Sequence, residues 1–345
     1  MYRELSAAFA RAVEEASGDV FESCYDFAGK PTRLRIVGGR LAGLIPRALA
    51  HLRVSDRPPA PGEFTIDLWD EAETGVGCPG CIANDDPAAA GITDVSANGV
   101  LVITTFAQIK SGFDRKSQRI VGWVGDADRL SQYDVGRPLH SQLLLWHRDR
   151  GLQALHAGLV GRGDDGILLG GPGGSGKTTT ALSCLQAGMA YLSDDYVVVD
   201  PNPGGAPVCH SVYSSSHVEP GHLERFPRLV PHAIPGRLAR EDKSLLLLSD
   251  LPGAILRSSV LLRAIVFPQV IDAPVSRYRP ASRAHALLRL APSSLGLLPY
   301  PMAMGEGFKA LSALVDRVPV YWLDLGRDLE QIPRAVGELI DEVTG

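Results

Sequence analysis

The segment GILLGGPGGSGKTTTALSCLQAG, residues 166–188, constrains the fold of this chain more than any other. It contains the pattern G-x-x-x-x-G-K-[ST], which runs from Gly171 to Thr178. A short apolar run precedes the pattern and an amphipathic run follows it. The segment therefore predicts a strand, a glycine-rich loop and a helix in succession. The helix is expected to end near Ala187, because Gly188 stands where a left-handed cap belongs.

The same pattern predicts a phosphate-binding loop. Glycines let the backbone turn its N–H groups inward around phosphate oxygens, where side chains would intrude. The positive dipole end of the helix favours the same anion. We expect Lys177 to reach the β- and γ-phosphates of a nucleotide, and the Thr178 hydroxyl to bind Mg²⁺. The residues expected to contact the nucleotide are Gly171, Gly173, Gly174, Ser175, Gly176, Lys177, Thr178 and Thr179. A glycine-rich turn without a ligand is the alternative.

Two adjacent acids, Asp194 and Asp195, follow the predicted helix and a short returning strand, MAYLS at 189–193. In a right-handed crossover, the end of the returning strand lies at the same sheet edge as the phosphate loop. A carboxylate there can serve Mg²⁺ or accept the proton of an attacking hydroxyl. Because adjacent residues of an extended chain point to opposite sides, we expect the two acids to differ in role. The alternative is that they cap a turn before the strand 196–199.

Residues 155–200 contain His156, the glycine-rich loop and the acid pair in that order. This stretch resembles the catalytic core of HPr kinase/phosphorylase and its diverged relatives, which have a histidine, a phosphate loop and an Asp-Asp pair in the same order. The segment 318–340, VPVYWLDLGRDLEQIPRAVGELI, resembles the same relatives more weakly.

The resemblance implies an α/β P-loop kinase domain like the C-terminal domain of HPr kinase. Its activity would be ATP-dependent phosphorylation of a hydroxyl, usually of serine, with Mg²⁺. It implies that Asp194 is the general base, that His156 lies near the transferring phosphoryl group and that Lys177 binds phosphate. We expect Asp195 on the metal side. A histidine that caps a turn is the alternative for His156.

The chain departs from the family after the acid pair. Members of the family have an Arg-Gly-Leu-Gly type of segment with a metal-binding glutamate, whereas this chain has CHSVYSSSHVEPGHLERFPRLV at 209–230. Glu219 is a candidate for that glutamate, and a solvated loop acid is the alternative. The departure argues against a phosphorylase activity and against HPr as the substrate. We therefore expect the acceptor to be a hydroxyl of a small molecule or peptide.

The chain before the kinase-like segment has a different pattern. Residues 1–16 predict an amphipathic helix. Short alternating runs at 32–38, 63–70, 99–106 and 119–126 are separated by turns such as DRPPAPG at 56–62 and predict a β-rich unit. A helix at 137–151 leads into the α/β part. We therefore expect a β-rich N-terminal region, residues 1–150, for substrate recognition or assembly, and a kinase domain, residues 151–345.

Composition excludes several classes of partner. The chain has 34 basic and 39 acidic residues, so no basic surplus indicates nucleic acid or an anionic membrane. Its apolar runs are shorter than the ~20 residues that a spanning helix needs, and the N-terminus lacks the pattern of a signal peptide. We expect a cytoplasmic protein.

Three weaker patterns give less information about the function. Cys78 and Cys81 have C-x-x-C spacing, as in a zinc or redox pair, but one pair supplies two of zinc's usual four ligands unless two copies of the chain associate. Asp250 and Gly253 resemble a GTPase switch, yet no N-K-x-D motif accompanies them, and a turn is the alternative. The arginines of the segment 277–289 suit either an arginine finger or a solvated basic helix face, and we prefer the helix face.

The hypothesis from the sequence is thus an ATP- and Mg²⁺-dependent kinase. Two other functions stay open: a P-loop ATPase or GTPase switch, and a nucleotide-binding sensor without turnover. All three need the phosphate loop. A carboxylate pair beside the loop favours the kinase over the sensor.

Overall fold

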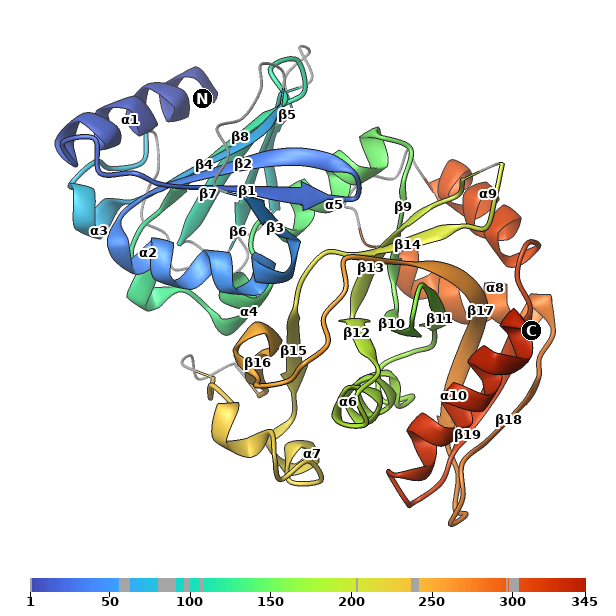
Figure 1. Ribbon diagram of the computed structural model, residues 1–345. Helices are drawn as coiled ribbons and strands as arrows, with labels where there is room; N and C mark the ends of the chain where they lie inside the picture. The colour runs from blue at the N-terminus through green and yellow to red at the C-terminus, as the bar shows by residue number, and fades with distance from the viewer. Residues whose placement is uncertain are drawn as a thin grey trace. The chain divides into compact units, whose positions relative to one another are not determined.

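The computed structural model describes residues 2–55, 63–79, 91–95, 100–105, 108–202, 204–236, 242–295, 297 and 304–345. The turn expected at 56–62 and Cys81 lie outside these ranges. The protein is a mixed α/β protein with two mixed sheets (Figure 1). The chain divides into two compact units, one ending at Gln142 and one comprising Leu143–Pro235 and Asp242–Gly345. The sequence had suggested a boundary near residue 150.

Unit 1 is built around a sheet with the strand order β3-β1-β2-β4-β8-β7-β6-β5. Its strands are β1 (Phe21–Phe27), β2 (Lys30–Val37), β3 (Arg53–Ser55), β4 (Phe64–Asp70), β5 (Gly91–Val95), β6 (Val100–Thr105), β7 (Ile109–Asp114) and β8 (Arg119–Val124). Its helices are α1 (Tyr2–Glu15), α2 (Gly39–Leu44), α3 (Glu71–Thr74) and α4 (Gln132–Gly136), with 3₁₀ turns η1 (Ile45–Leu52) and η3 (Ala127–Arg129). The predicted N-terminal helix and the four predicted strands are confirmed as α1, β2, β4, β6 and β8.

The amphipathic pattern of α1 sets which face is buried. Leu5, Ala8, Phe9 and Ala12 recur at helical spacing and are buried. They pack with large side chains of the sheet, including Trp69. This apolar contact holds the helix on the sheet.

The centre of the sheet is parallel, which the alternating pattern of the sequence had not indicated. Strands β2, β4 and β8 run in one direction. On β4, the fully buried Asp67 accepts hydrogen bonds from Arg35 Nε at 2.6 Å and from Arg119 Nε at 2.6 Å. The Arg35 guanidinium also lies 5.0 Å from the centre of the Phe9 ring. One buried carboxylate therefore joins three strands and the helix above them.

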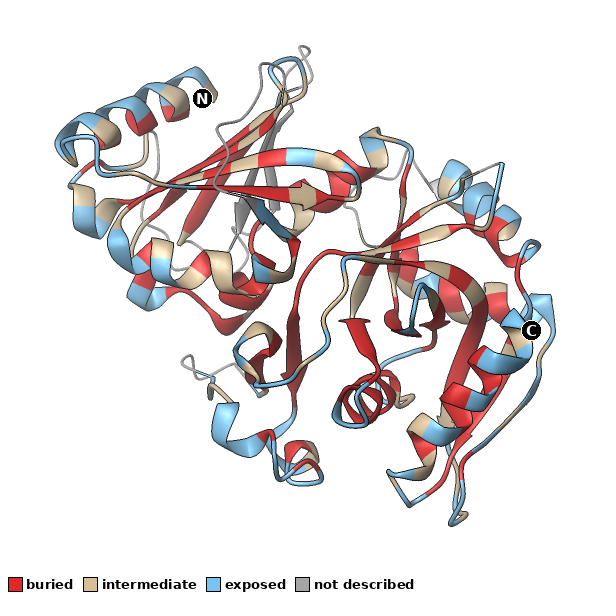
Figure 2. Cartoon of the chain, in the orientation of Figure 1, coloured by how far each residue is buried: buried red, intermediate tan, exposed pale blue. Residues whose placement is uncertain are grey.

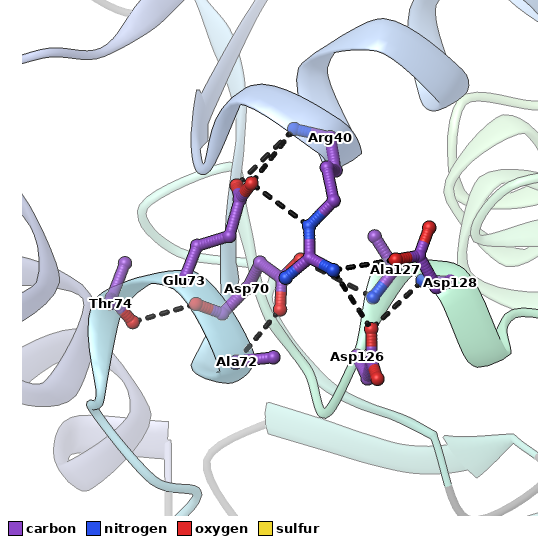
Figure 3. Close-up of polar contacts among 8 residues, drawn as sticks. All are labelled: Arg40, Asp70, Ala72, Glu73, Thr74, Asp126, Ala127 and Asp128. Atoms are coloured by element: carbon purple, nitrogen blue, oxygen red, sulfur yellow. Dashed lines mark hydrogen bonds and ion pairs between the residues drawn. The ribbon is translucent and has the colours of Figure 1, made fainter.

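The ends of these parallel strands are also joined by charge (Figure 3). Arg40, in α2 just after β2, donates from Nε to Glu73 at 3.0 Å and from Nη1 to Asp128 at 2.6 Å. Asp70, at the end of β4, caps α3 by accepting from the amide of Ala72 and also accepts from the amide of Ala127. Within the described part of the chain, no group of three or more His, Cys, Asp or Glu side chains is arranged to hold a metal ion.

Unit 2 has a nine-stranded sheet, in which β12-β10-β11-β17-β14-β13-β9 form one path and β19 joins β17 to β18. Its strands up to residue 218 are β9 (Gln153–His156), β10 (Gly158–Arg162), β11 (Asp165–Leu169), β12 (Ala190–Ser193), β13 (Tyr196–Asp200), β14 (Val208–Ser211) and β15 (Ser215–Val218). The later strands are β16 (Ser244–Leu247), β17 (Ser259–Val270), β18 (Arg277–Pro280) and β19 (Val320–Leu325). Strands β15 and β16 form a separate two-stranded ribbon.

Helices cover both faces of this sheet. The helices of unit 2 are α6 (Lys177–Gln186), α7 (Pro220–Leu223), α8 (Arg283–Ser294), α9 (Met304–Val315) and α10 (Gln331–Thr344), with 3₁₀ turns η4 (Val230–His232) and η5 (Leu248–Asp250). Helix α5 (His140–Asp149) begins in unit 1 and ends in unit 2. One core cluster includes α6 and α10, and the other includes α8 and α9. Leu169 belongs to the first cluster and Leu168 to the second, as alternation along a strand requires. Figure 2 shows the buried strands between these helices.

Candidate functional site

The glycine-rich loop, residues 170–176, lies between β11 and α6 as the sequence predicted. Gly171 has φ +130° and Gly176, which precedes the first residue of α6, has φ +106°. These left-handed conformations favour glycine. The end of the helix is confirmed too, because Ala187 is the C-cap and Gly188 has φ +80°. The loop therefore presents the first N–H groups of a ten-residue helix, which have no acceptor within that helix.

Lys177 lies inside the turn of this loop. Its Nζ donates hydrogen bonds to the carbonyl oxygens of Gly171 at 2.8 Å and Pro172 at 3.2 Å. Burial lowers the pKa of Lys177, while the charges of Asp195 and Asp194 raise it and that of Lys243 lowers it. The loop ammonium and the acid pair are therefore close enough to influence each other.

The acid pair lies at the same sheet edge as the loop, as predicted. Strand β10 is antiparallel to both β11 and β12, so these two run in the same direction with β10 between them. Gly158 of β10 is opposite Leu169, and its neighbour Leu159 is opposite Ser193. The ends of β11 and β12 are therefore level, and the glycine-rich loop and the acid pair leave the sheet side by side.

Asp194 is buried among hydroxyl groups. It is 4 % exposed. Its Oδ1 accepts from the Tyr191 hydroxyl at 2.9 Å and its Oδ2 accepts from the Ser216 hydroxyl at 2.7 Å, and the Thr178 hydroxyl also lowers the pKa of this carboxyl. Burial raises the pKa of Asp194, the charge of Asp195 raises it further, and the three hydroxyl donors oppose the rise. The carboxylate is thus held in one orientation against the helix of the loop.

Asp195 has a different partner, as expected for adjacent residues. Its Oδ1 lies 2.8 Å from His156 Nε2, and the two side chains are 30 % and 26 % exposed respectively. The His156 ring is stacked on Tyr196 with 5.3 Å between ring centres. His156 and Tyr196 are also register partners on β9 and β13, which fixes the histidine at this edge. The side chain that caps the turn before β13 is Ser193, whose Oγ accepts from the amides of Asp195 and Tyr196.

The remaining predicted residues lie around the start of α6. Thr179 is buried, and its Oγ1 lies 2.9 Å from His222 Nε2. Glu219 is exposed and precedes α7, and its charge acts on His222. Among the described residues, no hydrogen bond links Glu219 to Thr178 or to the acid pair. The structure thus brings together the loop, His156 and both acids, and places Glu219 at the surface, where its charge acts on His222.

Hard oxygen donors in this arrangement fit a magnesium ion. Mg²⁺ is usually bound by one or two carboxylates together with substrate phosphates, and it keeps several waters. The Thr178 hydroxyl lies in the first turn of α6, next to the loop that would hold the phosphates, and it lowers the pKa of the Asp194 carboxyl. The donor set thus suits a metal that arrives with a nucleotide, and a preformed protein cage is not needed.

Three side chains of the site were not among the predicted residues: Tyr191, Ser216 and His222. Tyr191 precedes the acid pair by three positions, and this spacing within a short strand was the available signal. Ser216 reaches Asp194 from the ribbon β15–β16. Local sequence carries no sign of such a contact, because it depends on where a distant segment folds.

The weaker patterns have structural explanations. Arg277 and Arg279 lie on β18 and pair with the buried Asp324. The preferred interpretation of the arginine segment, a basic helix face, is wrong for these two residues because they belong to a strand. Asp250 ends the short 3₁₀ turn η5, in agreement with the turn alternative. Cys78 is described, but its partner in the C-x-x-C pattern lies outside the described residues.

No protein-family model matches the chain, and no curated protein is similar enough to count as a relative. A search of the described helices finds none with the length and apolar character needed to span a bilayer.

Proposed function

We propose that this protein is an ATP- and Mg²⁺-dependent kinase that transfers the γ-phosphate to a hydroxyl of a small molecule or peptide. The observation that supports it is the position of the acid pair: β12, which leads into the pair, ends level with β11, which leads into the glycine-rich loop, and both acids raise the pKa of Lys177. Two carboxylates beside the loop favour a kinase over a sensor that only binds a nucleotide. The resemblance of residues 155–200 to HPr kinase also supports this proposal.

Different groups of the chain make different contributions to an in-line transfer. The loop amides and Lys177 hold the β- and γ-phosphates and neutralise charge on the transferring group. Mg²⁺, when bound with the nucleotide, supplies further positive charge there. One carboxylate of the pair accepts the proton of the acceptor hydroxyl, and the other lies on the metal side. The hypothesis from the sequence assigns the proton to Asp194.

The test is incubation of the full chain with γ-labelled ATP and a cell extract separated by size. The kinase proposal expects label on a peptide or metabolite fraction. Lys177→Ala should weaken ATP binding by about tenfold or more, because it removes a charge-assisted contact to phosphate. Lys309→Ala, on the exposed side of α9, is the matched control and should bind ATP as the wild type does.

The rival functions give different results in the same experiment. Release of free phosphate without labelled acceptor would support an ATPase switch. ATP binding without any turnover would support a sensor. Normal ATP binding by Lys177→Ala would contradict the assignment of the loop itself.

A further inference from the structure

A cavity of about 390 Å³ lies in unit 2, against strands β9 and β13. Residues of α8 and α9 line it from another side, and the end of α5 and the turn after it complete the described wall. None of the described lining residues belongs to the glycine-rich loop or to the acid pair. Sites for small molecules have volumes of about 300–1,000 Å³, so this cavity has the size of a site for a small ligand.

Most of the cavity wall is apolar. Ala154 of β9 and Val199 of β13 belong to it, together with the leucine side chains Leu152 and Leu314. All four residues are at most 8 % exposed. A ligand with an apolar body would remove its own apolar surface from water by entering this cavity. The wall therefore favours a ligand whose body is apolar.

The charged residues of the described wall are Arg148, Arg317 and Glu306. The Nη1 atom of Arg148 is buried and has no hydrogen-bond partner among the described residues. The guanidinium of Arg317 is held in place by the backbone. It donates to the carbonyl oxygens of Pro201, Asn202 and Gly205. Two guanidinium groups against one carboxylate leave one positive charge in excess at this wall.

This excess charge determines which polar group the ligand needs. An uncharged apolar ligand would cover the Arg148 guanidinium without giving it a partner, and a buried charge without a partner is costly. A carboxylate supplies that partner, and its two oxygens match the planar fork of the guanidinium. One carboxylate also balances the single excess charge, whereas a phosphomonoester would bring about −1.5 to −2 at pH 7.

We propose that this cavity binds a small molecule with an apolar body and one carboxylate, and that the carboxylate pairs with Arg148. Ser294 is 4 % exposed, lines the same cavity and offers a second donor. Its oxygen accepts from the backbone amide of His156 at 3.2 Å, so the hydroxyl proton is left for the ligand. The site is separate from the glycine-rich loop, and ligand binding there does not depend on the proposed kinase function.

The ligand class is tested by isothermal titration calorimetry of the full chain. The probes are 2-naphthoate, its amide 2-naphthamide, 2-naphthyl phosphate, and octanoate as a carboxylate with an alkyl body. At least one of the two carboxylates should bind with a Kd below about 1 mM. The binding carboxylate should be about tenfold or more tighter than its own amide, 2-naphthamide or octanamide, because the amide lacks the charge that pairs with the guanidinium. 2-Naphthoate should also bind more tightly than 2-naphthyl phosphate, and saturating ADP with Mg²⁺ should leave the carboxylate affinity unchanged.

Substitutions in the wall test the location. Arg148→Met should weaken binding of the carboxylate by about tenfold or more without weakening that of the amide, and Arg148→Lys, which keeps the charge, should recover part of the loss. Ala313→Phe, at an exposed position of α9 that lines the cavity, should weaken both compounds by occupying space. Arg11→Met, on the exposed side of α1, is the matched control and should bind as the wild type does. Thermal unfolding of each variant separates these effects from misfolding.

Several results would overturn the proposal. Absence of binding by both carboxylates would do so, as would equal affinity for a carboxylate and its amide. Tighter binding of 2-naphthyl phosphate than of 2-naphthoate would contradict the choice of a carboxylate. Displacement by ADP with Mg²⁺, or unchanged affinity in both Arg148→Met and Ala313→Phe, would show that the compound binds elsewhere.

Discussion

At the scale of single residues, the glycine-rich loop depends on Gly176 for its shape. This residue has φ +106°, and a Cβ added to it would collide with the side chain of Leu325. A left-handed conformation costs a residue with a side chain about 1–3 kcal/mol, and the collision adds to this. We expect Gly176→Ala to lower the free energy of unfolding by at least about 2 kcal/mol, measured by urea denaturation.

Gly173 in the same loop is the matched control. A Cβ at this position would meet no atom within 4 Å, and the backbone is not left-handed. Gly173→Ala should therefore change the free energy of unfolding by less than about 0.5 kcal/mol. Equal destabilisation by the two substitutions would show that the conformation of Gly176 is not the cause.

At the scale of secondary-structure elements, Asp67 joins three neighbouring strands of unit 1. The carboxylate is buried and accepts from Arg35 and Arg119, whose side chains are 28 % and 27 % exposed. Removing one partner of a buried pair leaves the other charge uncompensated, although here the arginines retain some contact with water. Asp67→Ala should therefore lower the free energy of unfolding by about 2–3 kcal/mol in urea denaturation.

Glu22 offers a control in the same sheet. Its carboxylate lies 3.6 Å from Arg33 Nε, and the two side chains are 42 % and 28 % exposed. Such pairs contribute little because water screens them. Glu22→Ala should change the stability by less than about 0.5 kcal/mol. A similar effect of the two substitutions would contradict the structural role given to Asp67.

Elements with a strong local pattern were predictable from the sequence. The helix α1 and the succession β11, loop and α6 follow from periodicity, glycine placement and a cap at Gly188. The parallel pairing of β2, β4 and β8 was not predictable, because strand order depends on contacts between distant segments. For the same reason, the position of β10 between β11 and β12 was not predictable from the sequence.

The candidate site was predictable to the same extent. The loop, His156 and the acid pair could be named because a motif and its spacing mark them. Their partners could not, since Ser216 reaches Asp194 through a ribbon that pairs residues 215–218 with 244–247. The different surroundings of Asp194 and Asp195 depend on these partners, and the sequence alone predicted only that the two acids differ.

At the scale of the whole molecule, a buried histidine couples stability to pH. His147 on α5 is 1 % exposed, and burial lowers its pKa to about 3. The unfolded chain binds a proton at this residue near pH 6.5, whereas the folded chain does not until about pH 3. Stability from this group is therefore complete above pH 6.5 and is lost as the pH falls towards 3.

We expect the free energy of unfolding to fall by about 2 kcal/mol when the pH is lowered from 7 to 5, because the unfolded chain takes up a proton at His147. His147→Leu should remove this part of the pH dependence, whatever its effect at pH 7. Urea denaturation of both proteins at the two pH values measures the difference. An unchanged pH dependence in the variant would contradict a neutral, buried imidazole.

Strand β17 bears on the order in which the chain folds during synthesis. It pairs with β11 through residues such as Asp165 and Leu261, nearly a hundred positions apart, and with β14 and β19 as well. Three parts of the chain leave the ribosome before β17: the glycine-rich loop, the acid pair and the ribbon strand β15. Since pairing across such separations is slow, β11 and the loop attached to it wait without their parallel neighbour. A nascent chain halted before residue 259 would therefore carry every residue assigned to the phosphate and the proton, but not the strand beside which β11 is fixed.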